Sequence, residues 1–378
     1  MPRIVIAVGF AGHPIAAAGN SWFFLQWVLG FRDLGWEVWL VESLPSAKLI
    51  DDRWQPARPG LSANERHWQA TLTRYGLHDH ATLLIDDQAA NLEEARDFAA
   101  NADVFLNMSG HFRSTVIQFP RAKKVYLDVD PAFTQIWAEV YGSDMNFAGH
   151  DVFFTVGSRL GKDDCRAPHL GINWKHTFPP VCLGHWPETR DDDFTRLTTV
   201  AHWQGYSWCE WKGEWYTGKS EQFALYREVP QKTQVPLEIA TEIADNREEL
   251  QKYAEAGWHL SDARSVCADF PSYEAFIRGS GGEFSAAKGG YVKSRCGWFS
   301  DRSVCYLAAG RPVIVESTGL EPDLPPQAGL HYFRTLEEAV RACGTVRENY
   351  PAERRGARKL AETVFSSRVV IPKMLEKL

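Results

Sequence analysis

The feature that most constrains the fold is a regular alternation of short apolar runs with helical patterns. Residues 3–8 read RIVIAV, an almost unbroken apolar run that is typical of a parallel strand buried on both faces. A loop of small residues follows, then a helical pattern that starts near Asn20 and ends at Gly35. Residues 36–41 form the next apolar run, so this stretch predicts one strand–helix–strand unit with parallel strands.

The same alternation continues through most of the chain. Further strands are expected at residues 81–86, 102–108, 124–128, 152–156, 197–203, 235–240, 264–268, 313–315 and 332–333. Helical patterns or loops separate these runs. The pattern predicts an α/β fold of two Rossmann-like domains, each built on a doubly wound parallel sheet.

The length of the chain fits this division. With 378 residues it is long enough for two domains of ordinary size. Residues 185–194 read HWPETRDDDF, a polar stretch that suits a linker between domains. We therefore expect one domain over residues 1–188, a second over residues 189–353, and a helical C-terminal segment over residues 354–378.

Composition narrows the class of protein. Hydrophobic residues make up 44% of the chain and charged residues 24%, as in soluble globular proteins with a sizeable core. The net charge of −7 argues against a large nucleic-acid-binding face. There is no apolar run of about 20 residues and no N-terminal signal-peptide pattern. Seven scattered cysteines without a CxxC pair suit reduced thiols. We expect a cytoplasmic protein without a transmembrane segment; its oligomeric state is not indicated.

Residues 289–320 carry the densest chemical signal, GGYVKSRCGWFSDRSVCYLAAGRPVIVESTGL. A glycine-rich basic loop that leads into a helix favours an anion, because backbone N–H groups and the helix dipole both attract negative charge. The strand that follows ends in Glu316 and a loop with Gly319, which suits the hydroxyls of a sugar or ribose. The candidate ligands for a diphosphate are Lys293, Ser294, Arg302 and Ser303.

Residues 308–314 of this segment, AAGRPVI, resemble the donor-binding segment of GT-B-fold glycosyltransferases. The usual form there is a helix ending Ala-x-Gly-x-Pro-Val-Val, followed by a loop with glycine and an acidic residue. Glu316, Gly319 and Glu321 match the second part. Many retaining members carry a glutamate five residues before the matched glycine, and this chain has Cys305 instead. The stereochemical outcome therefore stays open.

The resemblance implies a fold and a reaction. Two Rossmann-like domains would face an interdomain cleft, with a nucleotide diphosphate sugar on the second domain and a small-molecule or glycan acceptor on the first. Lys219, at the start of a helix after Gly218, is implied as a further diphosphate ligand. The C-terminal helix would cross back to the first domain. The chemistry requires neither a metal nor a cofactor, since basic groups stabilise the leaving diphosphate.

The first domain offers three candidates for proton transfer. Its loop after the first strand, with Gly9 and Gly12, resembles the glycine-rich loop of the acceptor domain and lacks the GxGxxG spacing of dinucleotide sites. His13 in this loop is the preferred general base of an inverting enzyme, because histidine has an ordinary pKa near ~6.5. His111 and Asp130 follow other strands of the same sheet and are rival candidates.

Two alternative functions remain open from the sequence. A sugar-nucleotide epimerase would use the same fold and diphosphate site without an acceptor. A catalytically inactive nucleotide-sugar-binding protein is the other, because Cys305 replaces the expected glutamate. An NAD-dependent oxidoreductase ranks below both, since the dinucleotide fingerprint is not satisfied, and the HExxH, GxSxG and Walker patterns do not occur.

Overall fold

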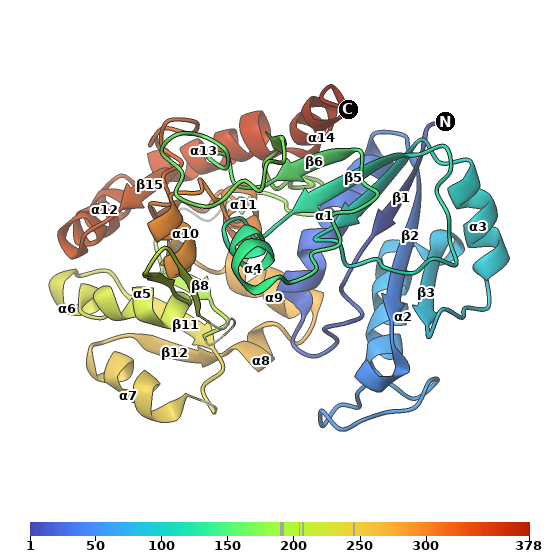
Figure 1. Ribbon diagram of the computed structural model, residues 1–378. Helices are drawn as coiled ribbons and strands as arrows, with labels where there is room; N and C mark the ends of the chain where they lie inside the picture. Colours follow the sequence, from blue (N-terminus) through green and yellow to red (C-terminus); the bar gives the residue numbers. More distant parts are fainter. Residues whose placement is uncertain (190–192, 204, 206–207, 245) are drawn as a thin grey trace.

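The computed structural model describes residues 1–378 except 190–192, 204, 206–207 and 245. It has two halves, each built on a parallel sheet with helices on its faces (Figure 1). This confirms the predicted α/β class with two Rossmann-like domains. The expected linker lies partly outside the described residues, and the domain boundaries stay a prediction.

The first sheet contains seven strands among the described residues, in the order β3-β2-β1-β4-β5-β6-β7, and every neighbouring pair is parallel. The strands are β1 Arg3–Ala7, β2 Glu37–Leu44, β3 Ala81–Ile85, β4 Val104–Met108, β5 Lys123–Asp128, β6 Val152–Thr155 and β7 Trp174–His176. The helices are α1 Ala18–Asp33, α2 Ala63–Tyr75, α3 Leu92–Ala100 and α4 Phe133–Tyr141, with short 3₁₀ turns at Ser46–Lys48 and His78–His80. Since all strands run in one direction, the loops after β1, β4 and β5 meet at one edge of the sheet.

The second sheet has the order β12-β11-β8-β13-β14-β15 and is also parallel throughout. Its strands are β8 Leu197–Val200, β11 Leu237–Thr241, β12 His259–Asp262, β13 Gly282–Ser285, β14 Val313–Glu316 and β15 Leu330–Phe333, and a separate antiparallel hairpin joins β9 Cys209–Trp211 to β10 Glu214–Tyr216. The helices are α5 Lys219–Leu225, α6 Val229–Lys232, α7 Arg247–Glu255, α8 Ala263–Val266, α9 Phe270–Arg278, α10 Gly289–Ser294, α11 Asp301–Ala308, α12 Leu336–Glu348, α13 Tyr350–Leu360 and α14 Ser367–Leu375.

One expected strand proves to be a helix. Residues 264–268 were expected as a strand, and the structure places the strand earlier, at β12, with α8 directly after it. The reason is a local cap: the side chain of Asp262 accepts a hydrogen bond from the backbone N–H of Arg264 and starts the helix.

The last helix returns to the first half of the molecule. A π-helical turn at Ala361–Phe365 follows α13, and α14 then packs against α1 (Figure 1). The contact is close at Gly30, where an added Cβ would lie 2.7 Å from Cδ1 of Ile371. A parallel bridge between Val181 and Ser366 supports the same contact. Within the described part of the chain, no helix combines the length and the apolar character needed to cross a membrane.

Candidate active site between the two halves

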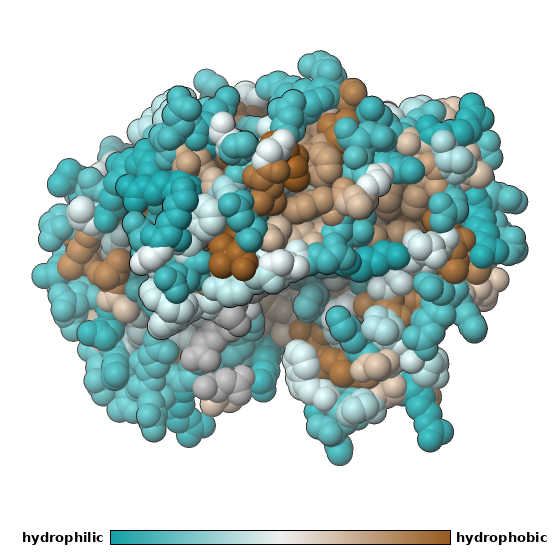
Figure 2. Space-filling model, in the orientation of Figure 1, coloured by the Kyte–Doolittle hydropathy of each residue, from teal (hydrophilic) through white to brown (hydrophobic). Residues whose placement is uncertain are grey.

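A large cavity lies between the two sheets. Its volume is about 910 Å³, and residues from both halves line it. Figure 2 shows the indentation between the two halves in the lower part of the view. The walls are formed largely by the loops that follow β1, β4, β5, β8, β11 and β13, where ligands bind in open parallel sheets. We call this cavity the interdomain cleft.

The loop after β1 is held in place by a buried carboxylate. Glu42 on β2 accepts hydrogen bonds from the backbone N–H groups of Ala11 (2.9 Å) and Gly12 (2.7 Å). Burial raises the pKa of Glu42 to about 7, although these hydrogen bonds oppose the shift. Gly9 lets the loop pass close to its neighbours, because an added Cβ would lie 3.1 Å from Phe24 and 3.2 Å from His111. The backbone N–H of Gly12 therefore helps to hold the loop against Glu42, and Gly9 lines the interdomain cleft.

Two predicted histidines line the first-half wall of the cleft. The ring of His111 lies beside Gly9, and His13 follows in the same loop. Partial removal from water lowers the pKa of His111 to about 4, and His13 adds to the shift. The same effect, with smaller contributions from His202 and Lys48, lowers the pKa of His13. Both rings are therefore neutral near pH 7, the state in which a histidine accepts a proton.

Asp130, the third candidate base, joins the two halves. It is 8% exposed, and its carboxylate lies 3.2 Å from Nζ of Lys288 and accepts a hydrogen bond from the hydroxyl of Tyr291. Lys288 follows β13, and Tyr291 lies on α10, so both donors come from the second half. Asp130 is thus brought to the cleft, with its charge already compensated.

Lys219 is the most unusual cation of the cleft. It is the first residue of α5, is 8% exposed and lines the interdomain cleft. Burial, together with the nearby charges of Arg302 and Lys288, lowers its pKa well below the ordinary value. Among the described residues, its ammonium group has no hydrogen-bond or ion-pair partner. The carboxylates of Glu283 and Asp301 oppose this pKa shift with smaller effects. A buried cation without a direct ion pair is costly, so this position favours an anionic ligand.

Arg302 lines the same cleft, and its guanidinium is used within the protein. It donates to Glu283 (2.6 Å), to the carbonyl of Val200 (2.8 Å) and to the hydroxyl of Ser285 (2.7 Å). It lies in the first turn of α11, whose N-cap is Ser300. Arg302 therefore fixes the start of α11 against the second sheet and contributes a positive field to the cleft.

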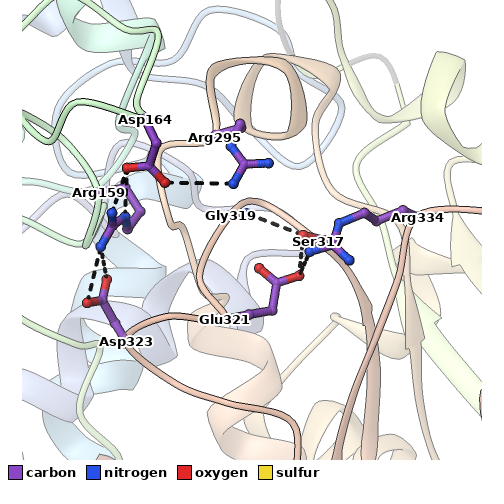
Figure 3. Close-up of polar contacts among 8 residues, drawn as sticks. All are labelled: Arg159, Asp164, Arg295, Ser317, Gly319, Glu321, Asp323 and Arg334. Atoms are coloured by element: carbon purple, nitrogen blue, oxygen red, sulfur yellow. Dashed lines mark hydrogen bonds and ion pairs between the residues drawn. The ribbon is translucent and has the colours of Figure 1, made fainter.

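The remaining predicted donor ligands lie elsewhere. Lys293 donates to the backbone carbonyl of Trp215 (2.9 Å), on the hairpin. It lines a second cavity, of about 220 Å³, together with Arg166, Val292, Arg295, Glu316, Ser317, Gly319 and Arg334. Figure 3 shows part of this region, where Arg334 pairs with Glu321. Position 319 favours glycine, because its φ is +87° and an added Cβ would lie close to the side chain of Arg295.

Glu316, Ser294 and Ser303 are buried near this second cavity. Glu316 accepts hydrogen bonds from the hydroxyl of Tyr226 (2.9 Å) and the N–H of Ala287 (3.0 Å), and burial raises its pKa to about 7. Ser294 donates to the carbonyl of Tyr291 and stabilises α10. The hydroxyl of Ser303 has no hydrogen-bond partner among the described residues and lines a small pocket beside Glu316.

The position of His202 after the first strand of the second sheet predicts that it faces the cleft, but its pairing with a carboxylate was not predicted. Nδ1 of His202 lies 2.5 Å from Oε1 of Glu242, and both residues line the interdomain cleft. Burial opposes ionisation of Glu242, but the hydrogen bonds from His202 and from the backbone N–H of Trp203, with smaller effects, together outweigh it and lower the pKa to about 2. The sequence analysis missed Glu242, Lys288 and Trp54. The signal for Glu242 and Lys288 was available, because each follows a strand of the parallel sheet.

The cleft gives no sign of a protein-built metal centre. Among the described residues, no group of three or more His, Cys, Asp or Glu side chains is placed to hold a metal ion. The lining of the cleft combines cations and the His202–Glu242 pair from the second half with histidines and Asp130 from the first.

Comparisons with known proteins reach the same fold. No protein-family model and no curated protein matches the sequence. Among solved structures, an alpha-glucosyltransferase in complex with UDP and DNA containing an HMU base aligns with a TM-score of 0.59 and 13% identity, over 99% of this chain and 98% of that one. HepE from Anabaena, in complex with UDP and glucose, aligns with a TM-score of 0.58 and 10% identity, over 100% of both chains. AviGT4, a glycosyltransferase involved in avilamycin A biosynthesis, aligns with a TM-score of 0.53 and 12% identity, over 100% of this chain and 97% of that one. The protein therefore has the GT-B fold of nucleotide-sugar glycosyltransferases, as the sequence predicted.

Proposed function

We propose that this protein is a glycosyltransferase that moves a sugar from a nucleotide diphosphate sugar to a hydroxyl group of a small-molecule or glycan acceptor. The observation that carries the proposal is Lys219, a buried cation that faces the interdomain cleft and forms no direct ion pair among the described residues. A diphosphate would give this ammonium group a direct anionic partner. Lys288 and the start of α11 lie in the same wall and add to the positive field.

The proposed reaction needs groups on both walls. The acceptor oxygen attacks the anomeric carbon of the sugar, and the bond from that carbon to the phosphate oxygen breaks. The electron pair leaves with the diphosphate, whose charge Lys219 and Lys288 stabilise. The acceptor proton passes to a neutral histidine of the first half, for which His13 is the first candidate. No metal is needed for these steps.

The donor to test first is a UDP-sugar, because the alpha-glucosyltransferase and HepE structures contain UDP. The alpha-glucosyltransferase structure also contains DNA. We favour a small molecule or glycan as the acceptor here, since this chain has a net charge of −7. We expect the protein to act in the cytoplasm, as its reduced cysteines suggest.

The test is calorimetric titration of UDP into the protein, with UDP release from UDP-sugars as the activity assay. Lys219→Met should weaken UDP binding by about one to two decades, the value of a charge-assisted contact of roughly 1.5–3 kcal/mol. Lys232→Met is the matched control, because that lysine is half exposed on α6. Equal UDP affinities in wild type and Lys219→Met would contradict the proposed diphosphate site. Tight UDP binding without any sugar transfer or hydrolysis would instead favour an inactive binding protein.

A further inference from the structure

One large aromatic ring is exposed inside the interdomain cleft. Among the described residues, eight large apolar side chains are exposed, and Trp54 is the one of these that lines the cleft. Its exposed fraction is 58%, so more than half of the side chain's surface is free to meet a ligand. The exposed part of this apolar side chain gains stabilisation only when something covers it.

A tight turn fixes the backbone at this residue. The carboxylate of Asp51 accepts hydrogen bonds from the backbone N–H groups of Arg53 (2.8 Å) and Gln55 (2.9 Å). The N–H of Asp51 donates to the carbonyl of Gln55 (2.8 Å), and the N–H of Trp54 donates to the carbonyl of Asp51 (3.1 Å). Trp54 has φ +62°, a conformation that bulky residues rarely adopt. The turn thus holds Trp54 at its tip in a conformation that glycine or asparagine would adopt at lower cost.

The first-half wall of the cleft, to which Trp54 belongs, combines apolar and polar groups. Ile15 and Phe23 are partly exposed and line the same side of the cleft. Hydrogen-bonding side chains lie among them: His13, Asn20, Ser109 and His111. A lipid would require a continuous apolar surface, and a flat aromatic ligand would leave these polar groups without partners. A sugar ring matches the pattern, because its faces carry C–H groups and its rim carries hydroxyls.

We propose that the acceptor is a carbohydrate, and that one of its pyranose rings stacks on Trp54. The ring's hydroxyl groups then reach the polar side chains of the same wall, and one of them lies toward His13. Tryptophan suits this contact because it offers a large, rigid apolar surface at a low cost in side-chain entropy. This inference rests on the proposed glycosyl transfer and names the chemical class of its acceptor.

The test measures UDP release from UDP-glucose, UDP-galactose and UDP-N-acetylglucosamine, each with a panel of mono- and disaccharides. We expect at least one sugar to accelerate UDP release by the wild type. Trp54→Ala should raise the Michaelis constant for that sugar more than about tenfold and change the constant for the donor less than about twofold. Trp54→Phe should recover part of the loss, since phenylalanine keeps an aromatic face.

The matched control is Trp215→Ala. Trp215 has a similar exposed fraction, 52%, and lies on β10 outside the lining of the cleft, so its removal should leave both Michaelis constants unchanged. If the wild type binds UDP and hydrolyses donors but no sugar accelerates release, or if Trp54→Ala behaves like Trp215→Ala, the carbohydrate acceptor is wrong and the transferase proposal stands. If the wild type neither binds UDP nor releases it from any donor, both proposals are overturned.

Discussion

At the scale of single residues, the cleft keeps groups that cost stability. Among the described residues, Lys219 is buried without a direct ion pair, and the hydroxyl of Ser303 is buried without a hydrogen-bond partner. Trp54 is exposed and conformationally strained. Destabilising groups of this kind are retained where they contribute to ligand binding. Here they lie around the interdomain cleft and the small pocket beside it.

We predict that Lys219→Met stabilises the ligand-free protein while it weakens UDP binding. Methionine fills a similar volume and carries no charge to desolvate, so the free energy of unfolding should rise by about 1–3 kcal/mol. Urea unfolding without ligand measures this change. The control Lys232→Met should stay within about 0.5 kcal/mol of the wild type, as surface substitutions usually do. A less stable Lys219→Met variant would show that the lysine is satisfied within the protein.

His13→Ala should lower the turnover number by about 10²–10⁴, the usual loss when a general base is removed. Donor affinity should change little, since His13 lies on the opposite wall from Lys219. Because its pKa lies below the ordinary value, the acid limb of the wild-type pH–rate profile should fall below pH ~6.5. Steady-state kinetics and the pH profile check both points. A loss of less than about tenfold would make His13 only a loop residue and move the role to His111 or Asp130.

The buried carboxyl of Glu316 should make stability depend on pH. Its pKa of about 7 in the folded state lies above the ordinary value of 4.5, so the folded protein binds the proton more tightly than the unfolded chain. Its contribution to stability is therefore present below pH ~4.5 and is lost as the pH rises through about 7, a change of about 3 kcal/mol. Glu316→Gln should remove this loss, so the variant gains relative to the wild type between pH 5 and pH 8 in urea unfolding. A constant difference across this range would contradict the prediction.

At the scale of secondary-structure elements, α11 is anchored by an ion pair. The guanidinium of Arg302, in the first turn of α11, is held by Glu283 on β13 and by two further acceptors. This anchoring places Ser300 and Asp301 at the wall of the interdomain cleft. The first turn of this helix thus organises the second-half wall of the interdomain cleft.

Arg302→Ala should destabilise the protein by about 3–5 kcal/mol, because it leaves the carboxylate of Glu283 buried without its cation. The double variant Arg302→Met with Glu283→Leu should lose much less, since apolar residues of similar volume replace the whole pair. Chemical unfolding of both variants and the wild type measures the difference. Equal losses in the single and double variants would show that Glu283 does not depend on Arg302.

At the scale of the whole molecule, several contacts join the halves, and two of them differ in kind. One is the ion pair of Asp130 with Lys288 across the interdomain cleft. The other is the packing of α14 against α1, which depends on glycine at position 30. The first contact borders the candidate active site, and the second lies where the C-terminal helix crosses back to the first half.

We predict opposite effects of alanine at two helical glycines. Gly30→Ala would place a Cβ 2.7 Å from Ile371, so it should destabilise the protein by about 1–3 kcal/mol. Gly344→Ala on α12 meets no atom within 4 Å and should stabilise by about 0.5–1 kcal/mol through helix propensity alone. Thermal unfolding measures both. Adding Ile371→Val to Gly30→Ala should restore part of the lost stability, because it removes the methyl group that the new Cβ would meet. If the double variant is no more stable than Gly30→Ala, the contact with Ile371 is not the cause of the loss.

The sequence by itself determined the architecture and the edge of each sheet that carries the site. Apolar runs separated by helical patterns specify parallel strands, and parallel strands bring their carboxyl ends to one edge. For that reason Gly9, His13, His111 and Asp130 could be placed together in the first half, and Lys219 and Arg302 in the second, before the structure was known.

Only the tertiary structure decided what each of these side chains contacts. Lys293 and Arg302 lie in one basic segment of the sequence. In the structure Lys293 donates a hydrogen bond to the β9–β10 hairpin, whereas Arg302 donates to Glu283. Asp130 meets Lys288, a residue 158 positions away in the chain. Local periodicity fixes which element a residue belongs to. The direction and partner of a side chain depend on how distant elements pack, and that is set by the burial of the whole core rather than by any local pattern.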